Sequence, residues 1–176
     1  VDAGLAGEII ERGPARARFG LLRDGAYTWL TPPKVLLELS WLEAAAPFAV
    51  LLLAAALFEE LVFRGYPLRR LADAVGSWAA TAVLAVGFGI AHLWNPNVTL
   101  FSTVNIALAA VWLSFAFFSP RGMGYAWGLH FGWNAGLALV FDAPVSGLTF
   151  DLPAVEYDPG TRAWVDGGAF GPEGGL

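Results

Sequence analysis

Six polar side chains interrupt otherwise apolar stretches of this sequence: Glu59, Glu60, Arg64, His92, His130 and Asn134. Ionisable groups inside a bilayer cost roughly 2.5 to 3.5 kcal/mol on insertion scales, so those that are retained usually face a bundle interior and serve a function. Carboxylates and imidazoles are common general acids and bases, and side-chain amides hydrogen-bond oxyanions in acyl-transfer sites. These residue types therefore predict a catalytic site inside a membrane.

The spacing of these residues predicts which of them share a helix face. Residues four apart on a helix lie one turn apart on the same face, so Glu60 is expected to face Arg64 and to fix that helix end. By the same spacing His130 faces Asn134, whose amide is expected either to orient His130 or to hydrogen-bond an oxyanion. Glu59 lies about 100° further round its helix and is expected to point into a cavity.

Each of these features alone also has a structural explanation. A glutamate and an arginine at a helix end often form a clamp, and a single buried histidine is usually a satisfied hydrogen-bond partner. What favours a function is the combination of two carboxylates, two histidines and an amide on three separate apolar segments. The eight Trp residues, by contrast, are expected to be packing and interface anchors.

The composition predicts a membrane protein. Hydrophobic residues make up 57% and charged residues 14% of the 176 residues, against about 25% charged in an ordinary soluble domain. No Asp, Glu, Lys or Arg occurs over the 47 residues from Ala74 to Pro120, a run that holds two spanning helices of about 20 residues each. Cysteine is absent, which excludes disulfides, a thiolate nucleophile and a Cys-based zinc site. The net charge of −5 argues against a nucleic-acid partner.

The hydropathy pattern predicts an all-α fold, a polytopic transmembrane helix bundle with about four spanning helices. The spans are expected at about 44–63, 77–93, 98–119 and 123–141, with an N-terminal interfacial helix over 34–43. Three regions are expected: a polar cytoplasmic segment 1–33, a transmembrane core 34–141, and an extracytoplasmic loop 142–176 that precedes a missing last helix. The chain begins with Val1 rather than Met, so we expect a piece of a longer protein.

The basic residues predict an orientation. Arg64, Arg69 and Arg70 lie between the first two spans and Arg121 between the last two, whereas the link at 95–97 carries no charge. Because Lys and Arg mark cytoplasmic loops, the first and third links are expected inside and the link at 95–97 outside.

Depth decides whether the polar residues can meet. At about 1.5 Å rise per residue, His130 lies roughly 14 Å from Arg121 and His92 roughly 22 Å from Ser77. Glu59 is too shallow to join them if its helix ends at Phe63, but it lies roughly 20 Å deep if the helix continues to Ala72. We therefore expect the longer helix, with a kink at Pro67. Six small residues are expected to let the helices approach closely: Gly87, Gly89, Gly128, Gly132, Ala135 and Gly136.

Three short motifs in the sequence resemble those of the CPBP family, the CAAX protease and bacteriocin-processing proteins. Residues 58–65 (FEELVFRG) resemble EExxxR, residues 88–92 (FGIAH) resemble FxxxH, and residues 130–134 (HFGWN) resemble HxxxN, in the family's order. Residues 167–174 (GGAFGPEG) are similar to a loop that precedes a last helix in bacterial members. The resemblance implies an all-helical membrane fold shared with the type II CAAX prenyl endopeptidases, and cleavage of a peptide bond inside or at the edge of the membrane.

The resemblance also implies a role for each of the polar residues. In that scheme Glu59 is the general base that activates the hydrolytic water and His92 assists it, His130 and Asn134 stabilise the tetrahedral oxyanion, and Glu60 and Arg64 hold the helix. Members are often described as metalloproteases, and Glu59, His92 and His130 would be the ligands of a divalent metal such as zinc. No HExxH helix is present. The amide beside one histidine slightly favours the metal-free mechanism.

Two other functions stay open at this point. A non-catalytic membrane scaffold or bacteriocin-immunity-type protein would keep the motifs for structure. A transporter, which is less favoured, would use the polar residues as a relay and would need helices broken near mid-membrane. The expected partners are membrane lipid and a membrane-associated peptide or protein substrate, and the expected location is a bacterial cytoplasmic membrane, where prenylated substrates are not expected.

Overall fold

The computed structural model describes residues 10–11, 17–18, 39–150, 152, 157 and 159–175. Its helices are α1 (Leu39–Glu60), η2 (Leu61–Gly65), α2 (Tyr66–Val75), α3 (Ser77–Ala91), α4 (Leu100–Phe118), α5 (Gly122–Ala135), η3 (Gly136–Val140), α6 (Ala163–Asp166), η4 (Gly168–Phe170) and η5 (Pro172–Gly174). Two short strands, β1 (Ile10–Glu11) and β2 (Ala17–Arg18), pair antiparallel. The core of the fold is thus all-helical, as predicted. Apart from these strands, the predicted segment 1–33 and residues 34–38 of the predicted interfacial helix lie outside the described residues.

The first long helix continues well past Phe63. α1 runs through the π-helical η2 into α2, which together form an apolar stretch of 35 residues from Trp41 to Val75. A kink was expected at Pro67, whereas the departure from helical geometry lies two residues earlier, at Gly65, which has ψ −114°. Pro67 then lies in the first turn of α2, where its missing N–H needs no partner. The longer of the two predicted helices is therefore the correct one.

Among the residues that the structure describes, two helices are long and apolar enough to cross a membrane, Trp41–Val75 and Leu100–Phe118. The predicted second span is the 15-residue α3, which at about 1.5 Å per residue is shorter than a bilayer core. It ends because His92 leaves helical geometry with φ −92° and ψ 2°. The predicted fourth span corresponds to α5 and η3. The described residues thus contain two candidate membrane-spanning helices, and the predicted four-span bundle is not confirmed.

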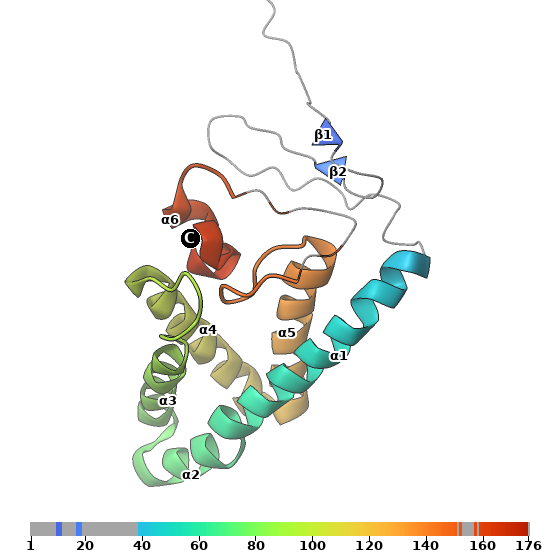
Figure 1. Ribbon diagram of the computed structural model, residues 1–176. Coiled ribbons are helices and arrows are strands. Elements are labelled where there is room, and N and C mark those ends of the chain that lie inside the picture. Colours follow the sequence, from blue (N-terminus) through green and yellow to red (C-terminus); the bar gives the residue numbers. More distant parts are fainter. Residues whose placement is uncertain are drawn as a thin grey trace, which may run out of the picture.

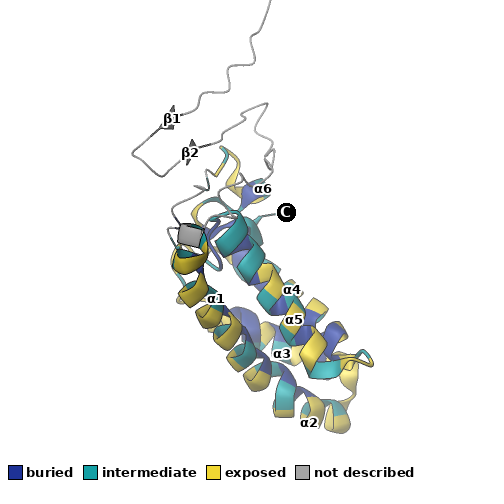
Figure 2. Ribbon diagram, turned by 90° about the vertical axis from the view of Figure 1, so that its right-hand side faces the viewer, coloured by how far each residue is buried: buried dark blue, intermediate teal, exposed yellow. Residues whose placement is uncertain are grey.

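The helices line a cavity together with the C-terminal segment. α3 packs against α4 on one side of the molecule, α1 lies on the other, and α5 packs against both α1 and α4 (Figure 1). Much of α1 is exposed (Figure 2), including the apolar side chains of Val50, Leu51 and Phe58. Apolar side chains exposed along a spanning helix suit contact with lipid.

Only one of the glycines expected at helix contacts allows a close approach. A Cβ on Gly89 would lie 3.0 Å from the Thr103 carbonyl oxygen of α4, so a larger residue would push α3 and α4 apart. Gly128, Gly132 and Gly136 instead have no atom within 4 Å of an added Cβ among the described residues. The prediction of close packing was wrong for those three, because that side of the helix faces open space.

The C-terminal segment contains short helices where a loop was expected. α6, η4 and η5 follow one another between residues 163 and 174, and Asn105 of α4 donates to the Gly175 carbonyl at 2.6 Å. Gly171 adopts φ +96°, and a Cβ there would lie 2.1 Å from the Pro144 carbonyl oxygen. The segment therefore folds tightly onto the bundle, where η5 packs against α4.

Candidate active site

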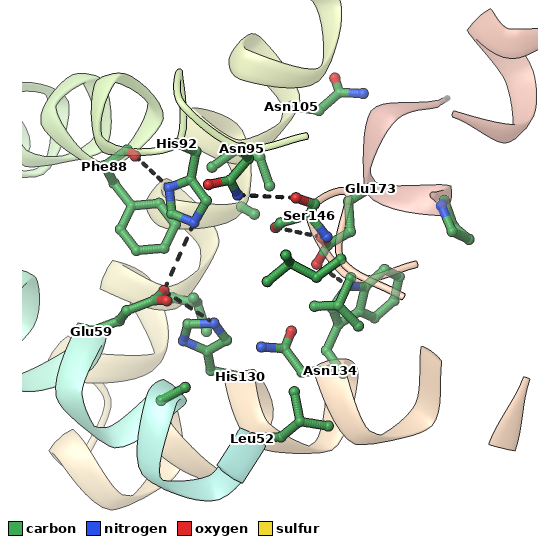
Figure 3. Close-up of a pocket in the computed structure, with 18 of the residues that line it drawn as sticks. Leu52, Glu59, Phe88, His92, Asn95, Asn105, His130, Asn134, Ser146 and Glu173 are labelled. Carbon is green, nitrogen blue, oxygen red and sulfur yellow. Dashed lines mark hydrogen bonds and ion pairs between the residues drawn. The ribbon is translucent and has the colours of Figure 1, made fainter. Parts of the chain in front are cut away.

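A cavity of about 1060 Å³ lies between the helices and the C-terminal segment. Its wall is mostly apolar, with side chains from α1, α3, α4 and α5. The polar and charged side chains that line it are Glu59, His92, Asn95, Asn105, His130, Asn134, Ser146, Tyr157, Asp166 and Glu173. Four of the six predicted site residues are in this set, and Figure 3 shows how they lie around one space.

Glu59 lies between the two histidines. Its Oε2 atom is 4.0 Å from His92 Nε2 and 3.6 Å from His130 Nε2 (Figure 3). The Glu59 side chain remains 30% exposed, so it has access to water in the cavity. It lies in the last turn of α1, directly before η2, and such π-helical turns are frequent at functional sites.

Glu60 points away from the cavity and forms a buried cluster. Its Oε1 atom accepts from Arg64 Nη1 at 3.0 Å and lies 2.8 Å from His130 Nδ1. Glu60 and Arg64 are almost fully buried, and the Arg64 guanidinium lies 4.4 Å from the centre of the Phe88 ring. The predicted pairing of Glu60 with Arg64 is present. The contact of Glu60 with His130 adds a second role, because it fixes the orientation of that ring.

The hydrogen bonds of the histidines assign a donor on each ring. His92 Nδ1 lies 2.8 Å from the Phe88 carbonyl oxygen, which can only accept, so Nδ1 carries the proton. The other nitrogen, Nε2, then faces Glu59. Glu60 Oε1 accepts from Arg64, and His130 Nδ1 is assigned as a second donor to the same oxygen. Each imidazole is therefore held by one nitrogen and offers the other to the cavity.

Asn134 lies one turn beyond His130 on α5 and is only 7% exposed. Its amide points into the cavity (Figure 3), and within the described part of the chain it makes no hydrogen bond. Of the two roles expected for Asn134, orienting His130 is taken by Glu60 instead. The amide is left free for a ligand in the cavity.

The donor set does not fit a metal site in this arrangement. No three His, Asp or Glu side chains in residues 39–150 or in the described part of 152–175 are grouped as ligands of one ion. Glu59, His92 and His130 face one another but do not form such a group.

Sequence reasoning missed the residues that close the cavity. Asn95 enters the sequence analysis only as part of the uncharged link at 95–97, whereas its Nδ2 donates to the Ser146 carbonyl at 3.0 Å. Glu173 was noted only within a glycine-rich run, yet it lines the cavity and hydrogen-bonds Trp133 and Ser146. Asn105 offered a usable signal, since an amide in an apolar span must find a partner. Asn95 and Glu173 lie in short segments without hydrophobic periodicity, so the sequence offered no signal for them.

One comparison with known proteins gave a match. The type II CAAX prenyl endopeptidase Rce1-like family matches residues 41–136 of the chain. This range begins near the start of α1 and ends at the start of η3, and it contains all six predicted site residues. No curated protein and no solved structure matches the chain.

Proposed function

Since the chain belongs to the type II CAAX prenyl endopeptidase Rce1-like family, whose members are membrane-embedded proteases, we propose that it hydrolyses a peptide bond of a membrane-associated protein or peptide. The observation that carries the proposal is the shared position of Glu59, His92, His130 and Asn134 on one cavity. Two apolar helices long enough to cross a bilayer support its location in a membrane. We also propose that the protein lies in the bacterial cytoplasmic membrane and is surrounded by lipid.

Glu59 and His92 hold the attacking water. Glu59 Oε2 and His92 Nε2 lie 4.0 Å apart, and both are acceptors when His92 is neutral. A water oxygen about 2.8 Å from each would donate one hydrogen to Oε2 and one to Nε2. As the water oxygen bonds to the scissile carbonyl carbon, Glu59 takes its proton. The same proton goes to the amide nitrogen when the C–N bond breaks.

His130 and Asn134 stabilise the oxyanion. The carbonyl oxygen becomes negative in the tetrahedral intermediate, and the free Asn134 amide donates to it. His130 donates from Nε2 when the ring carries a proton on each nitrogen, with Nδ1 held by Glu60 at 2.8 Å. Glu60 and Arg64 position His130 and do not touch the reacting atoms.

The substitution Asn134→Leu tests this assignment. It keeps the volume of the side chain and removes the donor, so we expect kcat to fall by about 10²- to 10³-fold. KM should change little, because the oxyanion exists only in the transition state. New peptide termini are measured by mass spectrometry in membranes that contain the full-length native or variant protein, and purified protein then gives the rates on the identified substrate.

A scaffold or immunity protein would give a different result. If native and Asn134→Leu membranes contain the same peptide termini while both proteins complement a deletion strain equally, the endopeptidase assignment is wrong. A loss of termini with unchanged protein level supports it. Exposed Asn97 on the α3–α4 link is outside the cavity wall, and its φ of +57° suits glycine, so Asn97→Gly serves as the control that removes an amide elsewhere.

We also expect turnover to survive removal of metal. Glu59 and His92 suffice to hold and deprotonate water in the proposed mechanism, and the donors are not grouped as metal ligands. Elemental analysis of purified protein and rates after exhaustive chelation provide the measurement. Loss of turnover that added zinc restores would instead identify a metallopeptidase.

A further inference from the structure

A second polar network lies on the cavity wall outside the proposed catalytic group. Glu173 Oε1 accepts from Trp133 Nε1 at 2.9 Å, and Glu173 Oε2 accepts from the Ser146 amide and hydroxyl, each at 2.7 Å. The Ser146 carbonyl accepts from Asn95 Nδ2 at 3.0 Å. Both Glu173 oxygens are therefore occupied, and four residues form one continuous chain of hydrogen bonds (Figure 3).

The two ends of this network lie next to the two histidines. Asn95 is three residues beyond His92, which caps α3. Trp133 is three residues beyond His130 on α5. The chain of hydrogen bonds from Asn95 to Trp133 thus links the two segments that carry the imidazoles across the cavity. A change in its length would alter how both rings face Glu59.

The centre of the network is a tight turn held from several sides. Val145 and Leu148 exchange two backbone hydrogen bonds of 2.9 Å, and Ser146 between them adopts φ +49°. A residue other than glycine keeps such a conformation only where its surroundings determine it. Gly147 supplies part of that constraint, since its N–H donates to the Phe170 carbonyl at 2.8 Å. The turn is a rigid spacer between the two histidine-bearing segments.

We propose that Glu173 is a positioning residue that, through Ser146 and Trp133, sets the separation of His92 and His130 around Glu59. The expected effect on catalysis rests on the proposed endopeptidase function. The expected effect on the separation of the two histidines does not. A carboxylate is required because three donors converge on its two oxygens. A glutamine has one acceptor oxygen, and its NH₂ group would face the donors of either Trp133 or Ser146.

The effect on the separation of the two histidine-bearing segments is tested by distance measurement between spin labels. The chain has no cysteine, so Ile90→Cys on α3 and Gly128→Cys on α5 accept labels selectively. Both positions are exposed, and each lies two residues before a histidine. We expect Glu173→Gln to broaden and shift the label–label distance distribution of the full-length protein in lipid nanodiscs. Glu43→Gln, on α1 and remote from the network, should leave the distribution unchanged.

The effect on catalysis is tested by measuring the rate of peptide hydrolysis by unlabelled proteins that carry the substitutions in the network. Glu173→Gln should lower kcat by about 10- to 100-fold and leave KM nearly unchanged, because displaced catalytic groups slow the chemical step. Trp133→Phe and Asn95→Ala each remove one link and keep the carboxylate, and we expect smaller losses with the same kcat pattern. These two variants keep the test decisive if Glu173→Gln does not fold.

The outcomes separate the two proposals. Unchanged distances and unchanged kcat in Trp133→Phe and Asn95→Ala would overturn the positioning role of the network. Altered distances in a protein that shows no Asn134-dependent cleavage would leave the network in place and remove the endopeptidase function. Altered distances together with a lowered kcat are the expected result.

Discussion

Replacement of Glu59 by glutamine is expected to lower kcat for peptide hydrolysis by about 10²- to 10⁴-fold, the contribution typical of a general base. Glutamine keeps the size of the side chain but cannot take the proton of the water that Glu59 and His92 hold between them. The distances of 4.0 Å to His92 and 3.6 Å to His130 are too long for direct hydrogen bonds. The substitution therefore removes little that holds the fold together.

Stability is the control for this prediction. Thermal unfolding of the Glu59→Gln protein in detergent should match that of the native protein, since the side chain is 30% exposed. Glu43→Gln, near the start of the same helix and outside the cavity wall, should keep full turnover. A Glu59→Gln protein that cleaves at the native rate would eliminate Glu59 as the base. If the variant unfolds at a lower temperature than the native protein, the loss of rate is instead due to lower stability.

Local periodicity explains why much of the site could be predicted from the sequence. The spacing of Glu60 and Arg64 fixes a shared helix face in any regular helix, and the structure has them 3.0 Å apart. The same helix geometry turns Glu59 away from that face, and Glu59 lines the cavity. The depth argument required the helix to pass Phe63, and it continues to Val75. Each of these steps depends only on residues close in sequence.

Contacts between distant segments explain what could not be predicted. Glu60 and His130 are 70 residues apart in the sequence, and no spacing rule relates them. Hydropathy also does not report where helical hydrogen bonding stops, so the span expected over 77–93 ends at Ala91 in the structure. The wall around Glu173 depends on a turn with Ser146 at φ +49°, a conformation that serine rarely adopts.

Replacement of Arg64 by alanine is expected to destabilise the protein by about 3 to 5 kcal/mol, the cost of removing one partner from a buried ion pair. Arg64 and Glu60 have side chains only 2% and 0% exposed, so Glu60 would keep a buried negative charge with His130 as its remaining neighbour. The contact of Arg64 with the Phe88 ring at 4.4 Å would also be lost. Denaturant unfolding followed by tryptophan fluorescence in detergent micelles measures the effect.

Arg70 provides a matched control on the same long helix. It lies 3.6 Å from Asp73, and both side chains are 65% exposed. Solvent-exposed pairs of this kind contribute little to stability, so Arg70→Ala should unfold almost as the native protein does. Equal destabilisation of the two arginine variants would contradict the importance assigned to the buried pair.

A double substitution separates the stabilising role of the pair from its role in the site. Glu60→Gln combined with Arg64→Met removes both buried charges, and such replacements are often neutral for stability. We therefore expect the double variant to be more stable than Arg64→Ala alone. Turnover should nevertheless stay low, because an amide in place of the Glu60 carboxylate can turn its NH₂ group toward His130 Nδ1 and no longer fixes the orientation of that ring. Recovery of stability together with full turnover would show that Glu60 serves the fold alone.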